Sequence, residues 1–413
     1  MKYIDLNGDL FRQTLVDQED GQFLGQVSSA MLEDDKTIVA VYPKGHGRGS
    51  VVEKISRDAG LTWSERIPLP ESFVTSLEVP TVYRMIDAAG KKRLMLFSGN
   101  YPIRMAVSED DGLTWSELKP MNDYGGICVM GDVFPLGEPG KYMAMFHDEV
   151  NALYGGDFSE RKTFWRYTQG NQTKYMFQLQ RRQEDGSFSP PEQIAFVDGN
   201  RNVPEENGQL IYETLAGHVD AGKLFHVNKI ITRDGGLTWS QPQTVARHPS
   251  AHLCEPGVIR LNDGTLAILM RENSRKFNSF IMFSEDNGET FTKPRELPDC
   301  LTGDRHTCRR LRDGRIAVTF RDNRAGSETL GDWVLWVGTD EDLRSGGEGQ
   351  YKFRLKKNYP NAGGGYGDCA YPGFHVLPDD TMVLITYGHW DEGKPAYVIA
   401  VRLNLRDIEK QGE

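Results

Sequence analysis

Ser56-Arg-Asp58-Ala-Gly60-Leu-Thr62-Trp63 is the first of four copies of one eight-residue pattern. The other copies span residues 108–115, 232–239 and 284–291, and together they define Ser/Thr-x-Asp-x-Gly-x-Thr followed by Trp or Phe. The pattern predicts a tight turn between strands, because the Asp carboxylate accepts nearby backbone N–H bonds, Gly tolerates a positive φ, and the aromatic ring packs against the sheet. Four copies predict a repeated β architecture in which the turns have a structural role.

The spacing of the copies sets the size of the repeating unit. Their aspartates are residues 58, 110, 234 and 286, which are 52, 124 and 52 residues apart. Runs rich in β-branched and aromatic residues precede the turns, such as residues 37–42 and 266–270, so each unit holds about four short strands. Repeated four-stranded units of this length are typical of a β-propeller.

Six innermost strands are expected, starting near Gln26, Glu78, Met130, Glu255, Arg305 and Tyr371. The sequence therefore predicts an all-β protein, a six-bladed β-propeller that forms a single domain over residues 1–413. The long gap in blade 3 is predicted to hold an insertion at about residues 149–222 and not a seventh blade, because only one strand, at residues 224–231, precedes the third turn. The last strand of blade 6 is expected from residues 11–16, since joining the two chain ends hides an open sheet edge.

Composition excludes several classes of partner. The 413 residues are 38% hydrophobic, which allows a sizeable core. The chain carries 59 acidic and 48 basic residues, a net charge of −11, which argues against a nucleic-acid groove or an anionic membrane surface. No stretch approaches the length of a membrane span, and the N-terminus lacks the apolar core of a secretory signal. We expect a soluble protein that is cytoplasmic, or secreted or periplasmic with its signal already removed.

No metal or cofactor is expected. The five cysteines, at positions 128, 254, 300, 308 and 369, show no zinc-finger spacing and are expected to be reduced or simply buried. The glycine run at residues 363–367 follows no predicted strand and opens no predicted helix, so it does not indicate a phosphate-binding loop.

The four turns resemble the Asp boxes of the sialidase (neuraminidase) superfamily of six-bladed propellers. The resemblance covers nearly the whole chain outside the insertion. Asp boxes specify the fold better than the activity, because propellers other than sialidases also contain them. Function must therefore follow from side chains at the starts of the innermost strands, where propeller ligands bind.

Two segments resemble sialidase catalytic strands. In that family a Glu opens one inner strand, and an Arg at the end of the next strand holds the substrate carboxylate; Glu255 and Arg271 occupy these places. The segment 370–387 resembles the strand that opens with the nucleophilic tyrosine, which implies that Tyr371 is the nucleophile and that Glu255 accepts its proton. The alternatives are an ion pair between strand ends for Glu255 and Arg271, and a packing role at the hub for Tyr371.

The chain departs from the family pattern in the first blade. Gln26 stands where sialidases have the first of three arginines, and the following loop, residues 42–50, contains no carboxylate to act as general acid. His46 is the natural substitute, because an imidazole exchanges protons near neutral pH. Arg48 is expected to replace part of the missing positive charge.

We predict that the remaining candidates contact the substrate. The expected position of the third arginine, near residues 331–333, holds none, so Arg305, His306 and Arg321 are the candidates for anion binding. Glu78 opens the second inner strand and is a further candidate, as is the pair His147 and Asp148 at the end of a strand in blade 3. Aromatic residues of the insertion, Trp165, Tyr167 and Tyr175, are candidates for stacking on a sugar.

Three functional hypotheses follow, and each has a carbohydrate as its partner. The first is an exo-acting glycoside hydrolase that cleaves a terminal sugar, expected to be acidic because arginines are available for an anion. The second is a polysaccharide lyase, or a His-dependent glycosidase acting on rhamnosyl or uronic-acid linkages, in which His46 and Tyr371 exchange protons. The third is a glycan-binding propeller without catalytic activity.

Overall fold

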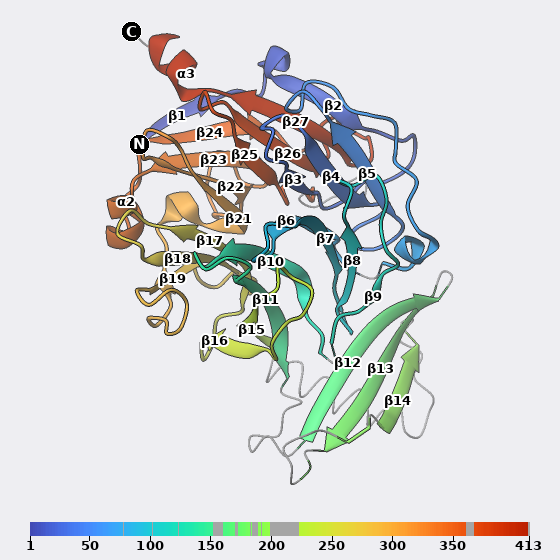
Figure 1. The fold of residues 1–413 in the computed structure, drawn as a ribbon. Helices are drawn as coiled ribbons and strands as arrows, with labels where there is room; N and C mark the ends of the chain where they lie inside the picture. The colour runs from blue at the N-terminus through green and yellow to red at the C-terminus, as the bar shows by residue number, and fades with distance from the viewer. Residues whose placement is uncertain are drawn as a thin grey trace.

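The computed structural model describes residues 1–76, 78–100, 102–122, 124–151, 160–169, 172–181, 183, 189–190, 192–198, 223–360 and 367–411. The chain forms a six-bladed β-propeller (Figure 1), which confirms the predicted fold class. From the hub outward, the first three blades are β3 (Ser28–Met31), β4 (Ile38–Pro43), β5 (Val51–Ser56); β6 (Thr81–Ile86), β7 (Lys92–Ser98), β8 (Arg104–Ser108), β9 (Lys119–Pro120); and β10 (Ile127–Pro135), β11 (Tyr142–Asn151), β15 (Lys223–Thr232), β16 (Gln243–Ala246).

The second half of the chain supplies three more blades. Their strands, again from the hub outward, are β17 (Leu253–Arg260), β18 (Leu266–Glu272), β19 (Phe280–Ser284), β20 (Arg295–Glu296); β21 (Gly303–Arg310), β22 (Ile316–Asp322), β23 (Trp333–Gly338), β24 (Tyr351–Lys356); and β25 (Gly373–Val376), β26 (Met382–Gly388), β27 (Tyr397–Leu403). Helix α2 (Asp340–Ser345) follows β23, and helix α3 (Leu405–Gln411) follows β27. The six inner strands begin within three residues of the positions predicted from the sequence.

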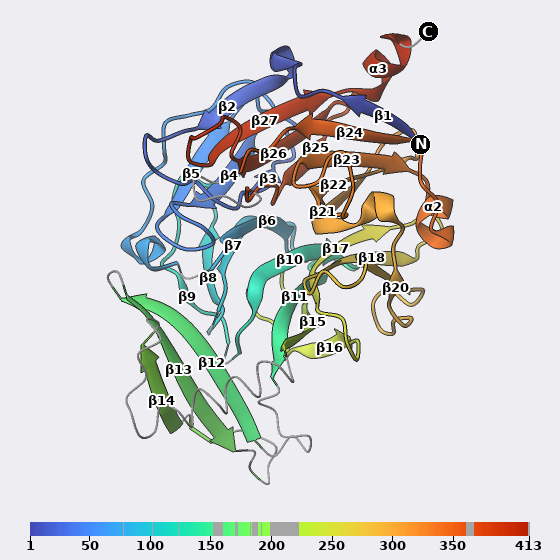
Figure 2. The same ribbon diagram turned by 180° about the vertical axis from the view of Figure 1, so that it is seen from behind.

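The N-terminal segment closes the ring by joining two blades (Figure 2). Strand β2 (Gln13–Asp17) pairs antiparallel with β27 and completes blade 6, as predicted. Strand β1 (Lys2–Asp5) pairs parallel with β24 at the outer edge of blade 5, which the sequence analysis did not foresee. Both outer edges are thereby covered by one segment.

The core lies between neighbouring blades. Every residue of β4, β23 and β26 is buried, because a middle strand is covered on both faces by the adjacent blades. This explains why the corresponding sequence runs are continuously apolar instead of alternating. Between blades 5 and 6, for example, Trp333 and Phe353 pack in one cluster with Leu384 and Val401.

The repeated turns have the predicted hydrogen bonds. Asp58 accepts the Thr62 backbone N–H at 2.8 Å and the Thr62 hydroxyl at 2.6 Å, and Ser56 Oγ both donates to Asp58 and accepts the N–H of Gly60. Gly60 has a φ of 84°. The same bonds recur around Asp110, Asp234 and Asp286, so these turns are structural elements of the blades.

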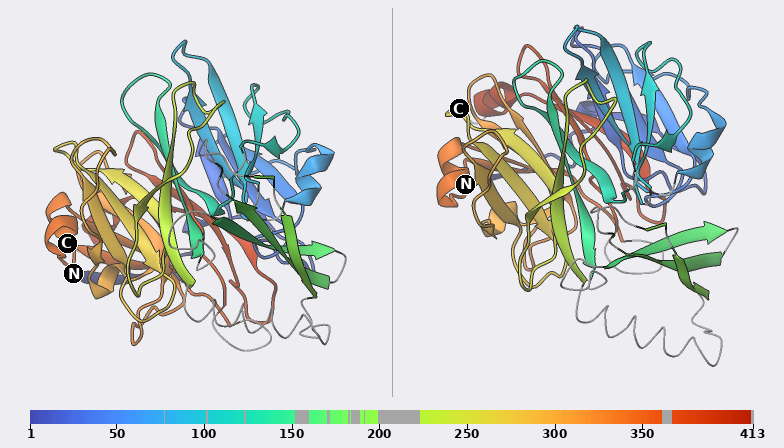
Figure 3. Two further views of the ribbon diagram at one scale, coloured as in Figure 1. Left: turned by 90° about the horizontal axis from the view of Figure 1, so that it is seen from below. Right: turned by 60° about the horizontal axis from the view of Figure 1, so that its bottom comes forward.

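The segment between β11 and β15 contains a sheet of its own. Strands β12 (Glu160–Gln169), β13 (Gln172–Arg181) and β14 (Glu192–Asp198) pair antiparallel, and Figure 3 shows them outside the ring of blades. The sequence predicts an insertion here but gives no sign of a separate three-stranded sheet. The exact insertion bounds stay a prediction, and the side chains of Trp165, Tyr167 and Tyr175 lie outside the described residues.

Glu53, in β5, is a carboxyl group enclosed between blades 1 and 2. Its side chain is fully buried, and Oε2 accepts the indole N–H of Trp115, from the second repeated turn, at 2.7 Å. Oε1 has no hydrogen-bond partner among the described residues. Burial raises the pKa of Glu53 from 4.5 to about 8, and the Trp115 bond offsets only part of this rise. Glu53 is therefore mostly protonated in the folded protein at neutral pH.

We expect the variant Glu53→Gln to be more stable than the wild type at about pH 8.5 but not at about pH 5. The carboxyl group ionises near pH 4.5 in the unfolded chain and near pH 8 in the folded one, so the wild type loses unfolding free energy as the pH rises between these values. An amide does not ionise, and we expect a gain of about 2 kcal/mol at the higher pH after the cost of a buried, unpaired N–H.

Urea unfolding of both proteins at the two pH values measures this difference. The exposed Glu65→Gln is the matched control and should behave as the wild type at both. A stability difference between Glu53→Gln and wild type that does not change with pH would contradict the assignment of Glu53 as a neutral buried acid.

Candidate functional site

Four blades share a backbone kink at the same end of their inner strands. Cys128 in β10, Glu255 in β17 and Arg305 in β21 have φ values of 50°, 49° and 56°, and Ala370, just before β25, has a φ of 59°. In the first three strands the pairing register shifts beside the kink, as in a β-bulge. Such a conformation costs a non-glycine residue about 1–2 kcal/mol, and it redirects the neighbouring side chain. The kinks bring Glu255, Arg305 and Tyr371 together.

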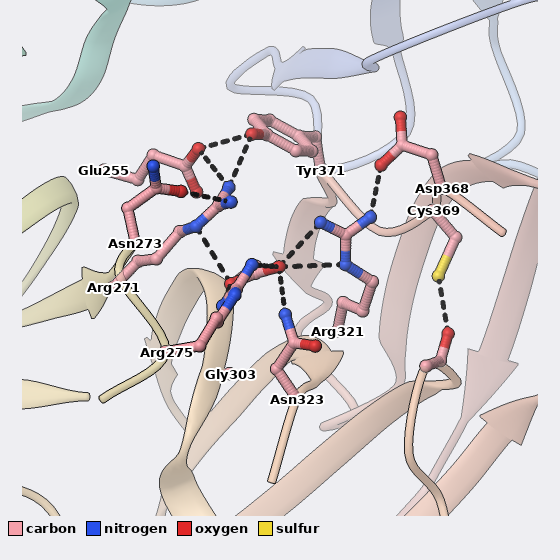
Figure 4. Close-up of polar contacts among 12 residues, drawn as sticks. Glu255, Arg271, Asn273, Arg275, Gly303, Arg321, Asn323, Asp368, Cys369 and Tyr371 are labelled. Carbon is pink, nitrogen blue, oxygen red and sulfur yellow. Dashed lines mark hydrogen bonds and ion pairs between the residues drawn. The ribbon is translucent and has the colours of Figure 1, made fainter. Parts of the chain in front are cut away.

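Tyr371 and Glu255 form the centre of the site. The Tyr371 hydroxyl donates a hydrogen bond to Glu255 Oε1, the group predicted from the sequence to accept its proton. Arg271 Nη1 lies 2.8 Å from the same carboxylate oxygen and 3.4 Å from the phenol oxygen, as Figure 4 shows. Burial, followed by the negative charge of Glu255, raises the pKa of Tyr371 well above its ordinary value. The phenol is therefore protonated at rest and needs a base before it can act as a nucleophile.

Beside this pair, Arg271, Arg275 and Arg321 lie close together (Figure 4) and converge on one carboxylate, that of Asp304. Arg275 contacts both of its oxygens, at 2.5 and 2.9 Å. Arg321 donates from Nε and Nη2, at 3.0 and 2.6 Å, and Arg271 Nε forms an ion pair at 3.0 Å. Although burial opposes ionisation, the charges of Arg271, Arg321 and Arg275 hold the pKa of Asp304 well below its usual range. Asp304 is fully buried and ionised.

A second carboxylate, Asp368, connects the arginines to His46. Arg321 Nη1 donates to one oxygen of Asp368, and the other oxygen accepts from His46 Nδ1 at 2.7 Å and from the Tyr387 hydroxyl at 2.6 Å. The hydrogen bond to Asp368 raises the pKa of His46 above its ordinary value, against the opposing effect of burial. The His46 side chain is 68% exposed, so this imidazole stands on the solvent side of the cluster.

The Gln26 side chain forms hydrogen bonds with the loop that carries His46. Its amide oxygen accepts the N–H of Gly47 at 2.6 Å, and its amide nitrogen lies 3.3 Å from Asp368 and 3.2 Å from His46 Nδ1. The side chain is nearly completely buried. Gln26 therefore positions the loop, a role that differs from the substrate contact expected from the sequence.

Two further predicted residues, Glu78 and Arg305, lie near the cluster. Burial raises the pKa of Glu78, and the nearby charges of Arg48 and His46 only partly offset this rise. Arg305 lies against the Tyr371 ring, with its guanidinium carbon 5.6 Å from the ring centroid, and donates to the Met130 carbonyl at 3.2 Å.

Two of the predicted histidines do not join the cluster of charged groups. His306 is turned to the Leu301 carbonyl, 2.8 Å from its Nε2, and to the ring of Phe320, so the structure does not place it for substrate binding. His147 instead accepts the backbone N–H of Glu255 at 3.4 Å and supports the kinked strand.

Sequence reasoning missed the carboxylates and their partners. Asp304 precedes Arg305, and Asp368 stands three residues before Tyr371, so the strand-start argument that selected their neighbours also covers both. Arg275 and Asn323 lie in loops after the second strands of blades 4 and 5, and their contacts with Asp304 have no signal in the repeat pattern. Asn273, which accepts from Arg271 Nη2 at 2.6 Å, was missed for the same reason.

The described residues show no grouping of three or more His, Cys, Asp or Glu side chains suited to a metal ion. All five cysteines are buried and none forms a disulfide. None of the described helices has the length and apolar character needed to cross a membrane.

Several solved structures resemble the chain, although no protein-family model and no curated protein sequence matches it. A protein of unknown function from Dyadobacter fermentans aligns over 95% of this chain and 97% of its own, with a TM-score of 0.56 and 14% identity. An alpha-L-arabinanase from Penicillium chrysogenum, solved with arabinobiose, aligns over 95% and 99%, with a TM-score of 0.51 and 14% identity. The Hadza microbial sialidase Hz136 aligns over 93% of this chain and 66% of its own, with a TM-score of 0.50 and 13% identity.

These identities are low, so the likeness shows a shared propeller fold. The fold is one that glycoside hydrolases use, as the arabinanase and the sialidase demonstrate. Activity has to be argued from the residues of this chain.

We expect Asp368→Asn to lower the pKa of His46. The substitution keeps the shape of the side chain but removes the charge that stabilises the imidazolium ion. A histidine-edited NMR titration, with the His46 resonance assigned through His46→Ala, measures the change. Tyr387→Phe is the matched control, because it removes one hydrogen bond to Asp368 and leaves the carboxylate charged. An unchanged His46 pKa in Asp368→Asn would show that the two residues are not coupled.

Proposed function

We propose that the protein is an exo-acting glycoside hydrolase that cleaves a terminal sugar through a covalent glycosyl-tyrosine intermediate. The observation that carries the proposal is the hydrogen bond between the buried phenol of Tyr371 and Glu255. A phenol with a raised pKa attacks only if a base removes its proton during attack. Glu255, oriented by Arg271, is in position to be that base.

His46 supplies the proton for the leaving group. Its raised pKa favours the imidazolium form near neutral pH, and Nδ1 is held by Asp368, which leaves Nε2 for proton exchange. An imidazolium is a general acid, whereas abstraction of a proton by a lyase requires the neutral ring. The support from Asp368 therefore favours hydrolysis over the lyase alternative.

The two half-reactions balance. In the first, Tyr371 Oη bonds to the anomeric carbon, the bond to the leaving oxygen breaks, the phenol proton moves to Glu255, and His46 protonates the departing alcohol. In the second, His46 takes a proton from water as its oxygen bonds to the anomeric carbon, the sugar–tyrosine bond breaks, and Glu255 returns its proton to Tyr371. Two displacements at one carbon retain the anomeric configuration.

We expect Tyr371→Phe to lower kcat by at least about 1,000-fold while substrate binding is kept, since the nucleophile is lost and the ring remains. Hydrolysis of a panel of terminal glycosides, followed by reducing-sugar release, measures kcat, and calorimetry measures binding. Tyr397→Phe, in blade 6 and away from Glu255, is the matched control. Full activity in Tyr371→Phe would overturn the nucleophile assignment, and unsaturated products absorbing in the ultraviolet would establish a lyase.

His46→Ala is expected to lose activity on oligosaccharides yet keep most of its kcat/KM on aryl glycosides with a 2,4-dinitrophenyl leaving group, because such a leaving group departs without a proton. The kcat of the variant on these glycosides should still fall, since His46 also activates water in the second half-reaction, and an initial burst of dinitrophenol should appear. The wild-type kcat should fall as the pH rises through the pKa of His46, and Asp368→Asn should move this fall to lower pH. Glu78→Gln tests the other carboxyl near the loop. If that variant, and not His46→Ala, shows the dependence on leaving group, Glu78 is the proton donor instead.

A further inference from the structure

The guanidinium groups of the site are already occupied by protein oxygens. Arg271 Nη1 contacts Glu255, Nη2 contacts Asn273, and Nε pairs with Asp304. Arg321 directs Nε and Nη2 to Asp304 and Nη1 to Asp368. A substrate carboxylate binds an arginine through two parallel N–H bonds on one edge of the guanidinium. All three nitrogens of Arg321 are thus hydrogen-bonded. Both terminal nitrogens of Arg271 are hydrogen-bonded, and its Nε is ion-paired with Asp304 although it has no hydrogen-bond partner among the described residues.

Arg275 has one edge of its guanidinium occupied, since its two terminal nitrogens bind the two oxygens of Asp304 in a bidentate arrangement. The carboxylate that the three arginines recognise is thus supplied by the protein. Asp304 is fully buried, and replacing it by a substrate carboxylate would leave a buried charge without partners, which is strongly unfavourable.

The arginines and carboxylates that form ion pairs with one another in the cluster are equal in number. Three guanidinium groups, those of Arg271, Arg275 and Arg321, face three carboxylates, those of Glu255, Asp304 and Asp368. Arg305 is a fourth cation, but it packs against the Tyr371 ring and is only 8% exposed. Its Nη1 has no hydrogen-bond partner among the described residues, which makes Arg305 a competing anchor for an anion.

Resting on the proposed hydrolase function, we infer that the sugar accepted next to Tyr371 is neutral and is recognised through hydroxyl groups, not through a carboxylate. The earlier expectation of an acidic sugar depended on an arginine edge open to the substrate. Carbonyl and carboxylate oxygens with unused lone pairs, such as Glu255 Oε2, which is buried without a partner among the described residues, are suited to accept sugar hydroxyls.

Matched glycosides test this inference. Within a set, all glycosides have the same stereochemistry and a 4-nitrophenyl aglycone, and they differ only at C6, which carries a hydroxymethyl, a carboxylate or a carboxamide group. The panel comprises the gluco and galacto series in both anomers. It also contains 4-nitrophenyl arabinofuranosides as neutral pentosides and a sialoside as the acidic extreme. Binding to Tyr371→Phe is measured by calorimetry, and hydrolysis by the wild type. The carboxamide has the size of the carboxylate without its charge, so it separates charge from shape.

We expect at least one neutral glycoside to bind, each uronate to bind at least tenfold more weakly than its carboxamide, and affinity to change little between low and high salt. In Asp304→Asn we expect a smaller difference in affinity between each uronate and its carboxamide, because the arginines lose their charged partner. If that variant does not fold, the comparison made with the wild type decides. Tighter binding of a uronate or the sialoside than of every neutral glycoside, weakened by salt or by Arg305→Gln, would overturn the inference. So would the absence of binding throughout the panel.

The two proposals fail separately. Preferential binding of neutral glycosides without any hydrolysis by the wild type keeps the inference and refutes the hydrolase function. Hydrolysis of uronates or sialosides in preference to neutral glycosides, lost in Tyr371→Phe, keeps the function and refutes the inference.

Discussion

The candidate site depends on the ion pairs formed by Asp304. One fully buried carboxylate receives Arg271, Arg275 and Arg321, and two of these arginines continue to Glu255 and Asp368. An unbroken series of contacts therefore runs from the Tyr371 hydroxyl to the His46 imidazole. Removing a partner from a buried ion pair costs about 3–5 kcal/mol, so the arginines keep their orientation without a ligand. Groups that are held in place before a ligand binds lower the entropic cost of binding it.

The backbone supports this arrangement with strain that is repeated from blade to blade. Cys128, Glu255, Arg305 and Ala370 all have a left-handed backbone conformation at the start of an inner strand. A single such residue is unfavourable, but the sheets packed on both sides and the N-terminal strands that close the ring stabilise the kinks. Because the blades repeat, the same local geometry places a carboxylate in one blade, a guanidinium in the next and the residue before a phenol in another. The chemistry differs while the backbone device stays the same.

The fold was accessible from the sequence because it is periodic. Four turns with one pattern and one spacing indicated the blades, and continuous apolar runs located their middle strands. The contact between Tyr371 and Glu255 also followed, since both residues open inner strands. What the pattern lacks is information on side chains that meet across blades: Arg275 and Asn323 stand in loops of unrelated sequence and come together only at Asp304. The parallel strand β1 and the extra sheet β12–β14 were missed because neither belongs to the repeat.

The charges around position 26 explain why a glutamine is suited to this position. An arginine there would add a cation beside Arg321 and His46, next to a set of three guanidinium and three carboxylate groups that already cancel. Gln26 instead offers an amide oxygen to the Gly47 N–H and an amide nitrogen to the Asp368 side, so it holds the loop of His46 without a charge. The neutral amide leaves Asp368 paired with His46, and this pairing raises the pKa of His46. The residue at position 26 and the support of His46 are thus coupled electrostatically, because the carboxylate that an arginine at this position would neutralise is the one that pairs with the histidine.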